Sequence, residues 1–95
     1  MEFKKIIDIN GSNYILEPST HKNKKYDVFI NINNYKKFIV SFGDIRYEHY
    51  YDKIGFYKNL NHYDEERRKR YIQRHKNDHI DDPLMAGFWS FHFLW

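Results

Sequence analysis

The sequence contains no cysteine among its 95 residues. A disulfide framework and a thiol-dependent enzyme are therefore excluded, and a reducing compartment is the default expectation. A glycine-rich phosphate loop and a nucleophile elbow are also missing. The sequence therefore offers no support for an activity that depends on either of these two motifs.

Long apolar runs are absent as well. No stretch approaches the roughly 20 consecutive apolar residues that a transmembrane helix needs, and the apolar run at the N-terminus is too short for a signal peptide. We therefore expect a soluble, intracellular protein that is not secreted and has no membrane partner.

Aromatic residues are abundant, at 20% of the chain. The core should therefore be built from Tyr, Phe and Trp rings, which bury large areas and keep polar tips. The 16 Lys and Arg outnumber the 13 Asp and Glu, giving a net charge of +3. This excess favours an acidic partner only weakly, so the placement of the charges carries more information. The length predicts one domain spanning residues 1–95.

Two β-hairpins are expected in the first half of the chain. The first occupies residues 1–18, with strands at 3–9 and 13–16 and a turn at Asn10-Gly11, a strong two-residue hairpin signal. The polar stretch from Ser19 to Lys25 has nothing to bury and is predicted to be a surface loop.

The second hairpin has strands at 26–32 and 35–42, joined by Asn33-Asn34. Strict alternation predicts that Phe38, Val40 and Phe42 share one face of the sheet. The following segment, residues 44–57, has no sustained period and is predicted to be irregular. We expect its aromatic rings to pack the next helix onto the sheet.

A helix is predicted from Asn61 to His75, with acids at its start, bases along its length and Asn61 as its cap. Five residues at helical spacing should face the sheet: Asp64, Arg68, Tyr71, Ile72 and His75. The opposite face should form a basic stripe in solvent, made of Lys69, Arg70, Gln73 and Lys76.

A second helical segment should begin at Asp82-Pro83, because Asp caps well and Pro is tolerated at the first helical position. It leads into FWSFHFLW (residues 88–95), which is too apolar to hang free. This segment either completes the core or docks into another subunit, which leaves a homo-oligomer possible. The fold class is thus α+β: a small single domain with antiparallel β-hairpins packed against one main basic helix, plus a short aromatic C-terminal helix.

Three pieces of sequence together resemble a known family. They are SFG (residues 41–43), the pattern H-x-D-x-x-R-R-x-x-Y-x-x-R-H, and the pattern A-G-F-W-S-x-x-x-L-W. The chain is similar over residues 25–95 to a family of small proteins, without established function, of giant DNA viruses and some tailed phages. The resemblance implies a viral origin and a location in the host cytoplasm or the virion, and it assigns no activity. The residues that carry it are His62, Asp64, Arg67, Arg68, Tyr71, Arg74, His75, Trp89 and Trp95.

Two catalytic or metal hypotheses arise from the histidines. His75 and His79 lie four residues apart with aspartates nearby, which superficially resembles metal-ligand spacing. His62 with the arginines that follow suggests a nuclease, but the carboxylate cluster that would hold Mg²⁺ is not apparent. Capping and packing are the favoured explanation of His62 and His75, and we predict no metal, cofactor or catalytic residue.

The arginines of the helix also allow two interpretations. Arg67 and Arg68 are expected to pair with carboxylates, whereas outward cations remain free to bind phosphates. We predict a non-enzymatic nucleic-acid-binding protein whose contacts come from Lys69, Arg70, Arg74, Lys76, Lys22, Lys24 and Lys25. The alternative is a virion structural protein that docks onto capsid proteins through its aromatic C-terminus.

Overall fold

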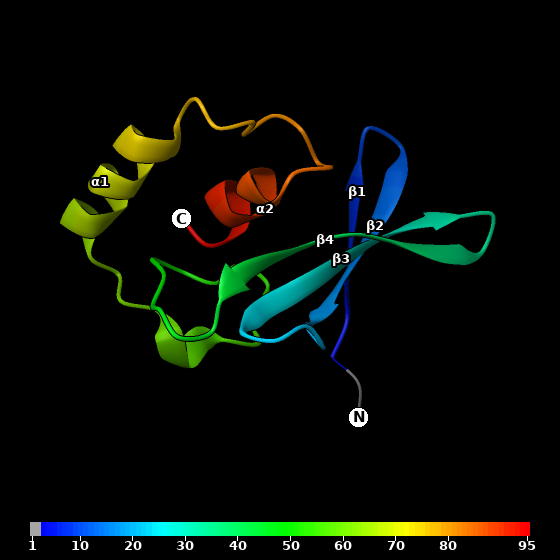
Figure 1. The fold of residues 1–95 in the computed structure, drawn as a ribbon, viewed down its shortest axis with the longest axis horizontal. Coiled ribbons are helices and arrows are strands. Elements are labelled where there is room, and N and C mark those ends of the chain that lie inside the picture. The colour runs from blue at the N-terminus through cyan, green and yellow to red at the C-terminus, as the bar shows by residue number, and fades with distance from the viewer. Residues whose placement is uncertain (1–2) are drawn as a thin grey trace.

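A computed structural model describes residues 3–95 and confirms the α+β class: a four-stranded antiparallel sheet with two helices (Figure 1). The sheet is a meander with strand order β1-β2-β3-β4. The elements are β1 (Lys5–Ile9), β2 (Ser12–Pro18), β3 (Lys24–Ile32), β4 (Tyr35–Asp44), the short 3₁₀ helix η1 (Lys58–Leu60), α1 (Glu65–His75) and α2 (Ala86–Phe93).

Both predicted hairpin turns are confirmed. Asn10 and Gly11 have φ angles of 52° and 84°, and Asn33 and Asn34 have φ angles of 51° and 65°. Two consecutive positive φ angles match the twist of the flanking strands, and asparagine and glycine adopt them at little cost. The Asp8 carboxylate also accepts a hydrogen bond from the Gly11 N–H at 3.0 Å.

A β-bulge changes the faces of β4. Val28 pairs with Val40 while the next residue of β3, Phe29, pairs with Phe38, so Ile39 is an extra residue in β4. Because side chains alternate along a strand, this residue places Phe38 on the face opposite to Val40. The prediction that Phe38, Val40 and Phe42 share a face is therefore wrong for Phe38.

The helices are stacked in an order that the sequence did not indicate. α2 packs on β4, and α1 contacts α2 without contacting any strand, so α2 lies between α1 and the sheet (Figure 1). The face of α1 that was predicted to meet the sheet therefore meets the C-terminal segment instead: the Tyr71 ring stacks on Trp95 and lies 6.5 Å from Phe91.

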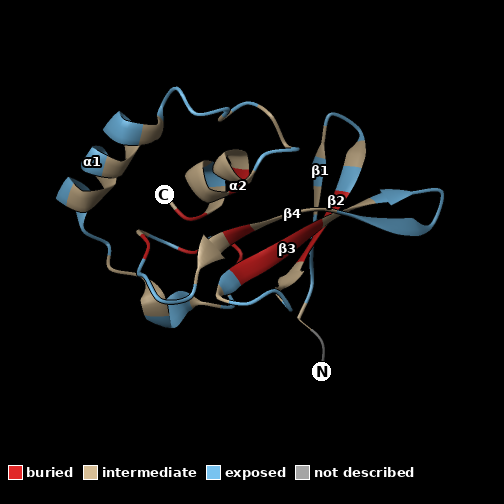
Figure 2. Cartoon of the chain, viewed as in Figure 1, coloured by how far each residue is buried: buried red, intermediate tan, exposed pale blue. Residues whose placement is uncertain are grey.

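The core lies between the sheet and α2 (Figure 2). Its centre is Trp89, whose indole is fully buried and lies 5.3 Å from Tyr14, 6.2 Å from Phe42 and 5.4 Å from Phe93. Its Nε1–H donates to the Pro83 carbonyl at 2.8 Å. Of the two predicted fates for the aromatic end of the chain, the structure shows the first, in which it completes the core of its own domain.

Residues 45–64 form an irregular segment with η1 as its only helical turn, so the prediction of irregular structure for residues 44–57 is confirmed over 45–57. The start of α1 differs from the prediction: Asp64 caps the helix, accepting from the N–H groups of Glu66 and Arg67. Asn61 cannot cap it, because its side-chain oxygen already accepts from the His49 ring at 2.6 Å and from the Asp52 N–H at 2.7 Å.

The start of α2 is also later than predicted. Asp82 and Pro83 form a turn in which the Asp82 carboxylate accepts from the Leu84 N–H at 3.0 Å. Met85 is extended, with φ −111° and ψ 142°, so the helix begins only at Ala86. No helix within residues 3–95 has the length and apolar character that crossing a membrane requires.

Candidate functional site

Three arginines of α1 line one hollow. Arg67, Arg70 and Arg74 lie at positions i, i+3 and i+7, so their side chains leave the same face of the helix. With Tyr47, Glu48 and Trp95 they enclose a space of about 230 Å³, which we call the arginine cleft. The cleft therefore joins a row of cations to two aromatic rings.

The charges of the arginine cleft are only partly compensated. Arg67 pairs with Glu48, its Nη1 lying 3.0 Å from the carboxylate Oε1. Within residues 3–95, Arg70 and Arg74 form no ion pair. Two exposed guanidinium groups are therefore free to bind an anion.

A second hollow adjoins this cleft on the side of the sheet. It measures about 340 Å³ and shares Tyr47, Glu48 and Trp95 with the arginine cleft. Exposed Lys24 lies at its strand side, beside Gly43, whose φ of 75° and lack of Cβ leave room for the Lys25 stem. We call this space the strand hollow.

Trp95 forms a fixed wall between the two spaces. Its indole stacks on the Tyr71 ring at 4.3 Å with an interplanar angle of 5°. The main-chain oxygen of Trp95 accepts from Arg68 Nε at 2.8 Å, while the Arg68 guanidinium lies 5.1 Å from the centre of the Tyr50 ring. Arg68 thus has the structural role expected for it.

Two histidines of the sequence pattern, His62 and His75, help to hold Trp95 and Tyr71 in place. His62 Nδ1 accepts from the Asp64 N–H at 2.9 Å, and its ring lies 5.1 Å from that of Trp95. His75 packs against Tyr71 at 4.4 Å. Trp89, by contrast, lies in the core and takes no part in the site.

Only part of the predicted basic stripe borders the arginine cleft. Arg70 lines the cleft, whereas Lys69 does not and pairs with Glu66 at 3.6 Å. Lys76 lies at the end of the helix on the same side as Lys69 and is exposed. Lys69, Arg70, Gln73 and Lys76 thus all face solvent, as expected for the stripe, and Arg70, about one-third of a turn from Lys69 and Lys76, lies at its edge next to the arginine cleft.

Only part of the predicted surface loop, residues 19–25, is exposed. Lys22 and Lys24 are exposed, but Lys25 is 2% exposed, so its placement in a surface loop is wrong. Lys25 Nζ lies 2.8 Å from His49 Nδ1 and is not free to contact a nucleic acid. Burial lowers the pKa of Lys25 to about 8, against the opposing charges of Asp52 and Asp44.

His49 links this lysine to the rest of a buried polar network. Because its Nδ1 accepts from Lys25, its proton lies on Nε2, which donates to the Asn61 oxygen. Burial, followed by the Lys25 charge, lowers the pKa of His49 to about 4. Asp52 completes the network, accepting from the Tyr26 hydroxyl and from the Tyr57 N–H at 2.9 Å. Lys25, Tyr26, His49 and Asp52 are buried, and their network fixes the irregular segment against β3.

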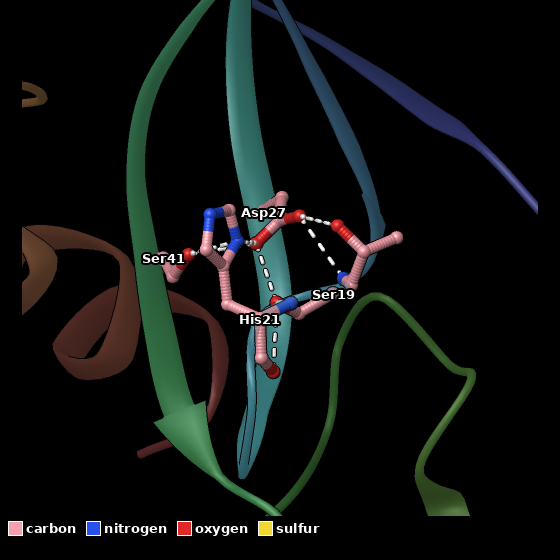
Figure 3. A network of polar contacts seen from close by, with 5 residues as sticks. Ser19, His21, Asp27 and Ser41 are labelled. Carbon is pink, nitrogen blue, oxygen red and sulfur yellow. Dashed lines mark hydrogen bonds and ion pairs between the residues drawn. The ribbon is translucent and has the colours of Figure 1, made fainter.

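A second polar cluster resembles a catalytic triad (Figure 3). Ser41 Oγ lies 3.2 Å from His21 Nδ1, and the same Nδ1 lies 2.9 Å from the Asp27 carboxylate. A triad requires the serine and the carboxylate to contact different ring nitrogens. Since Nδ1 donates to Asp27, it cannot accept the proton of Ser41.

Asp27 instead organises the β2–β3 loop. It is 3% exposed. Burial opposes its ionisation, but hydrogen bonds from Ser19, Ser41 and His21 outweigh burial and hold its pKa below the ordinary value. The cluster therefore anchors the loop that carries Lys22 and leads into β3, which begins at Lys24.

His75 and His79, the histidines considered as metal ligands, do not belong to a shared group of potential metal ligands within residues 3–95. His75 Nδ1 lies 2.9 Å from the Asp78 carboxylate, and His79 lies in a turn with φ 46°. Within residues 3–95, no group of three or more His, Asp or Glu side chains is arranged to hold a metal ion.

Sequence reasoning missed Tyr47 and Glu48 as parts of the site. They lie in the irregular segment, whose aromatic residues were all expected to be packing residues, yet Tyr47 is 66% exposed. The helical spacing of Arg67, Arg70 and Arg74 was a usable signal for the arginine cleft. Nothing in the sequence indicated which loop would lie opposite them.

Comparisons of the chain with protein-family models, with curated proteins and with solved structures find no match.

Proposed function

We propose that this chain is a non-enzymatic nucleic-acid-binding protein that grips phosphates in the arginine cleft. The observation that carries the proposal is the pair Arg70 and Arg74, which form no ion pair within residues 3–95 and line the same cleft as the exposed ring of Tyr47. The sequence resemblance to proteins of giant DNA viruses implies a viral origin, so under this proposal the ligand is viral nucleic acid.

The chemistry of the cleft suits phosphate. Guanidinium groups are planar and present paired N–H donors that match phosphate oxygens, and they keep their charge at every physiological pH. Arg70 and Arg74, one helical turn apart, can contact neighbouring phosphates of a backbone. Such contacts carry no sequence information, so binding should tolerate many sequences and weaken with salt.

The double variant Arg70→Gln/Arg74→Gln tests the site. Loss of two charge-assisted contacts should weaken binding at least about tenfold at low salt. The slope of log affinity against log salt should also fall by about two units, one for each lost phosphate contact. Fluorescence anisotropy with a labelled oligonucleotide over a salt series measures both quantities.

The matched control is Lys69→Gln/Lys76→Gln. It removes the same number of charges from α1 and its C-cap, but from two residues that do not line the arginine cleft. Circular dichroism should show both variants folded. Equal weakening by the two variants would mean that only net charge matters, and the arginine cleft would not be the site.

A single substitution should improve binding. Glu48 places a carboxylate in the arginine cleft and pairs with Arg67. Glu48→Gln removes this negative charge and releases Arg67, so affinity should rise by roughly two- to fivefold, as expected for surface charges worth up to about 1 kcal/mol. Weaker binding by this variant in the same anisotropy assay would count against the cleft.

A virion structural role is the second candidate, supported by a different surface. At the open end of the sheet an apolar groove of about 420 Å³ is lined by Ile32, Phe38 and Leu84, which are 47%, 44% and 61% exposed. Exposed apolar grooves often mark protein contacts. Multi-angle light scattering separates the candidates: defined oligomers without any oligonucleotide binding would favour the structural role.

A further inference from the structure

We infer that the ligand is single-stranded nucleic acid, one base of which stacks on Tyr47 at the junction of the arginine cleft and the strand hollow. The inference rests on the proposed function and adds to it the class of nucleic acid that the site accepts.

Tyr47 is placed to receive a base. It lines both the arginine cleft and the strand hollow and is 66% exposed. The Arg46 guanidinium lies 5.9 Å from the centre of its ring and is itself paired with Asp44 at 2.7 Å. Tyr47 thus has a cation on its ring and remains largely open to solvent, as aromatic residues that stack on unpaired bases do.

The wall opposite is rigid and aromatic. Trp95 is held by its stack on Tyr71 and by the hydrogen bond from Arg68. A platform fixed in this way loses little conformational entropy when a ligand arrives. The strand hollow, at about 340 Å³, falls within the size range of small-molecule sites, so a base and its sugar can enter it.

The positions of the cations favour an unpaired strand. Arg70 and Arg74 line the same narrow space as Tyr47, so a phosphate held by these arginines brings its own nucleotide next to the tyrosine ring. In a duplex the base faces are covered by neighbouring bases and only their edges are accessible. An unpaired base can swing out and expose its face, which is the usual way in which aromatic residues recognise single strands.

The first experiment separates base contacts from phosphate contacts. Wild-type protein is titrated by fluorescence anisotropy against an oligothymidylate, an abasic oligonucleotide of the same length, and a duplex of the same length. We expect the oligothymidylate to bind about tenfold or more tightly than the abasic strand, in line with the usual contribution of one stacked base. It should also bind more tightly than the duplex.

The second experiment assigns the effect to one side chain. Tyr47→Ala should lower the affinity for oligothymidylate to that for the abasic strand, whereas Tyr47→Phe should restore it, because stacking requires the ring and not the hydroxyl. Tyr35→Ala is the control: Tyr35 is 68% exposed, close to the value for Tyr47, but lies at the tip of the β3–β4 hairpin. It should leave binding unchanged.

The outcomes distinguish this inference from the proposed function. If the abasic strand binds as tightly as oligothymidylate, or if Tyr47→Ala has no effect, the base-stacking inference is overturned. The phosphate site survives that result as long as Arg70→Gln/Arg74→Gln still weakens binding to all three ligands. If the arginine variant binds every ligand as tightly as wild type does, the proposed function fails and the inference fails with it.

Discussion

The Trp89→Ala variant is expected to lose about 3–5 kcal/mol of its free energy of unfolding, because a large aromatic side chain would leave a cavity in a close-packed core. Trp89 is fully buried and contacts rings from β2, β4 and α2, including Tyr14, Phe42 and Phe93. A domain of this size holds roughly 5–15 kcal/mol in total. Urea denaturation followed by circular dichroism should show a much lower midpoint or no folded baseline.

Two controls define the cause of that loss. Trp89→Phe keeps a ring in the core and gives up the hydrogen bond to Pro83, so it should cost less than the alanine variant. Tyr35→Ala removes an exposed ring and should change stability by about 0.5 kcal/mol or less. A Trp89→Ala variant with the wild-type midpoint would show that α2 does not hold the sheet as described.

Acid should destabilise the protein between pH 6.5 and 4, because His49 is buried in its neutral form. Burial, with the Lys25 charge next to it, lowers the pKa of His49 from 6.5 to about 4. In this interval the unfolded chain binds the proton and the folded chain does not, so stability rises with pH across it and is lost as pH falls. A shift of this size corresponds to a loss on the order of 3 kcal/mol.

The surroundings of His49 explain why it resists protonation. Its Nδ1 accepts from Lys25, so a proton on that nitrogen would face an ammonium group at 2.8 Å. The hydrogen bond to Asn61 and the charge of Asp52 act in the opposite direction and only partly offset this effect.

The His49→Gln variant should show a flatter slope of unfolding free energy against pH in this range, although the variant is less stable than the wild-type protein. The exposed His79 gives the control, since His79→Gln should keep the wild-type slope; equal slopes in all three proteins would refute the assignment.

Local sequence signals accounted for the elements of the fold but not for their stacking. The pairs Asn10-Gly11 and Asn33-Asn34 fix two turns through backbone geometry alone, and charge order located α1 within a few residues. The bulge at Ile39 depends on the pairing of β4 with β3, and the sequence of either strand alone does not indicate it. The position of α2 between α1 and the sheet likewise depends on packing between distant parts of the chain.

The site was harder to predict than the fold. Because Lys25 follows several polar residues, the sequence predicts an exposed loop residue. In the structure it lies in β3, which pairs with β4, and its side chain is buried against His49. The positions of Arg70 and Arg74 follow from helical geometry, but Tyr47 and Glu48 reach them through a segment without periodicity. Such residues can be assigned to a site only when the three-dimensional structure is known.

The pairing of the last residues with the irregular segment has a consequence for biosynthesis. Tyr51 and Lys53 donate their backbone N–H groups to Leu94 and Phe93, at 3.1 and 3.0 Å, and Trp89 and Leu94 fill the core over the sheet. All four strands are synthesised before these residues. At roughly 5–20 residues per second, the chain between Asp44 and Leu94 takes about 3–10 seconds to make. Until translation has passed Leu94, no helix covers the inner face of the sheet, which carries Leu16, Val28 and Phe42. The domain therefore completes its core only after the residues of α2 have been made.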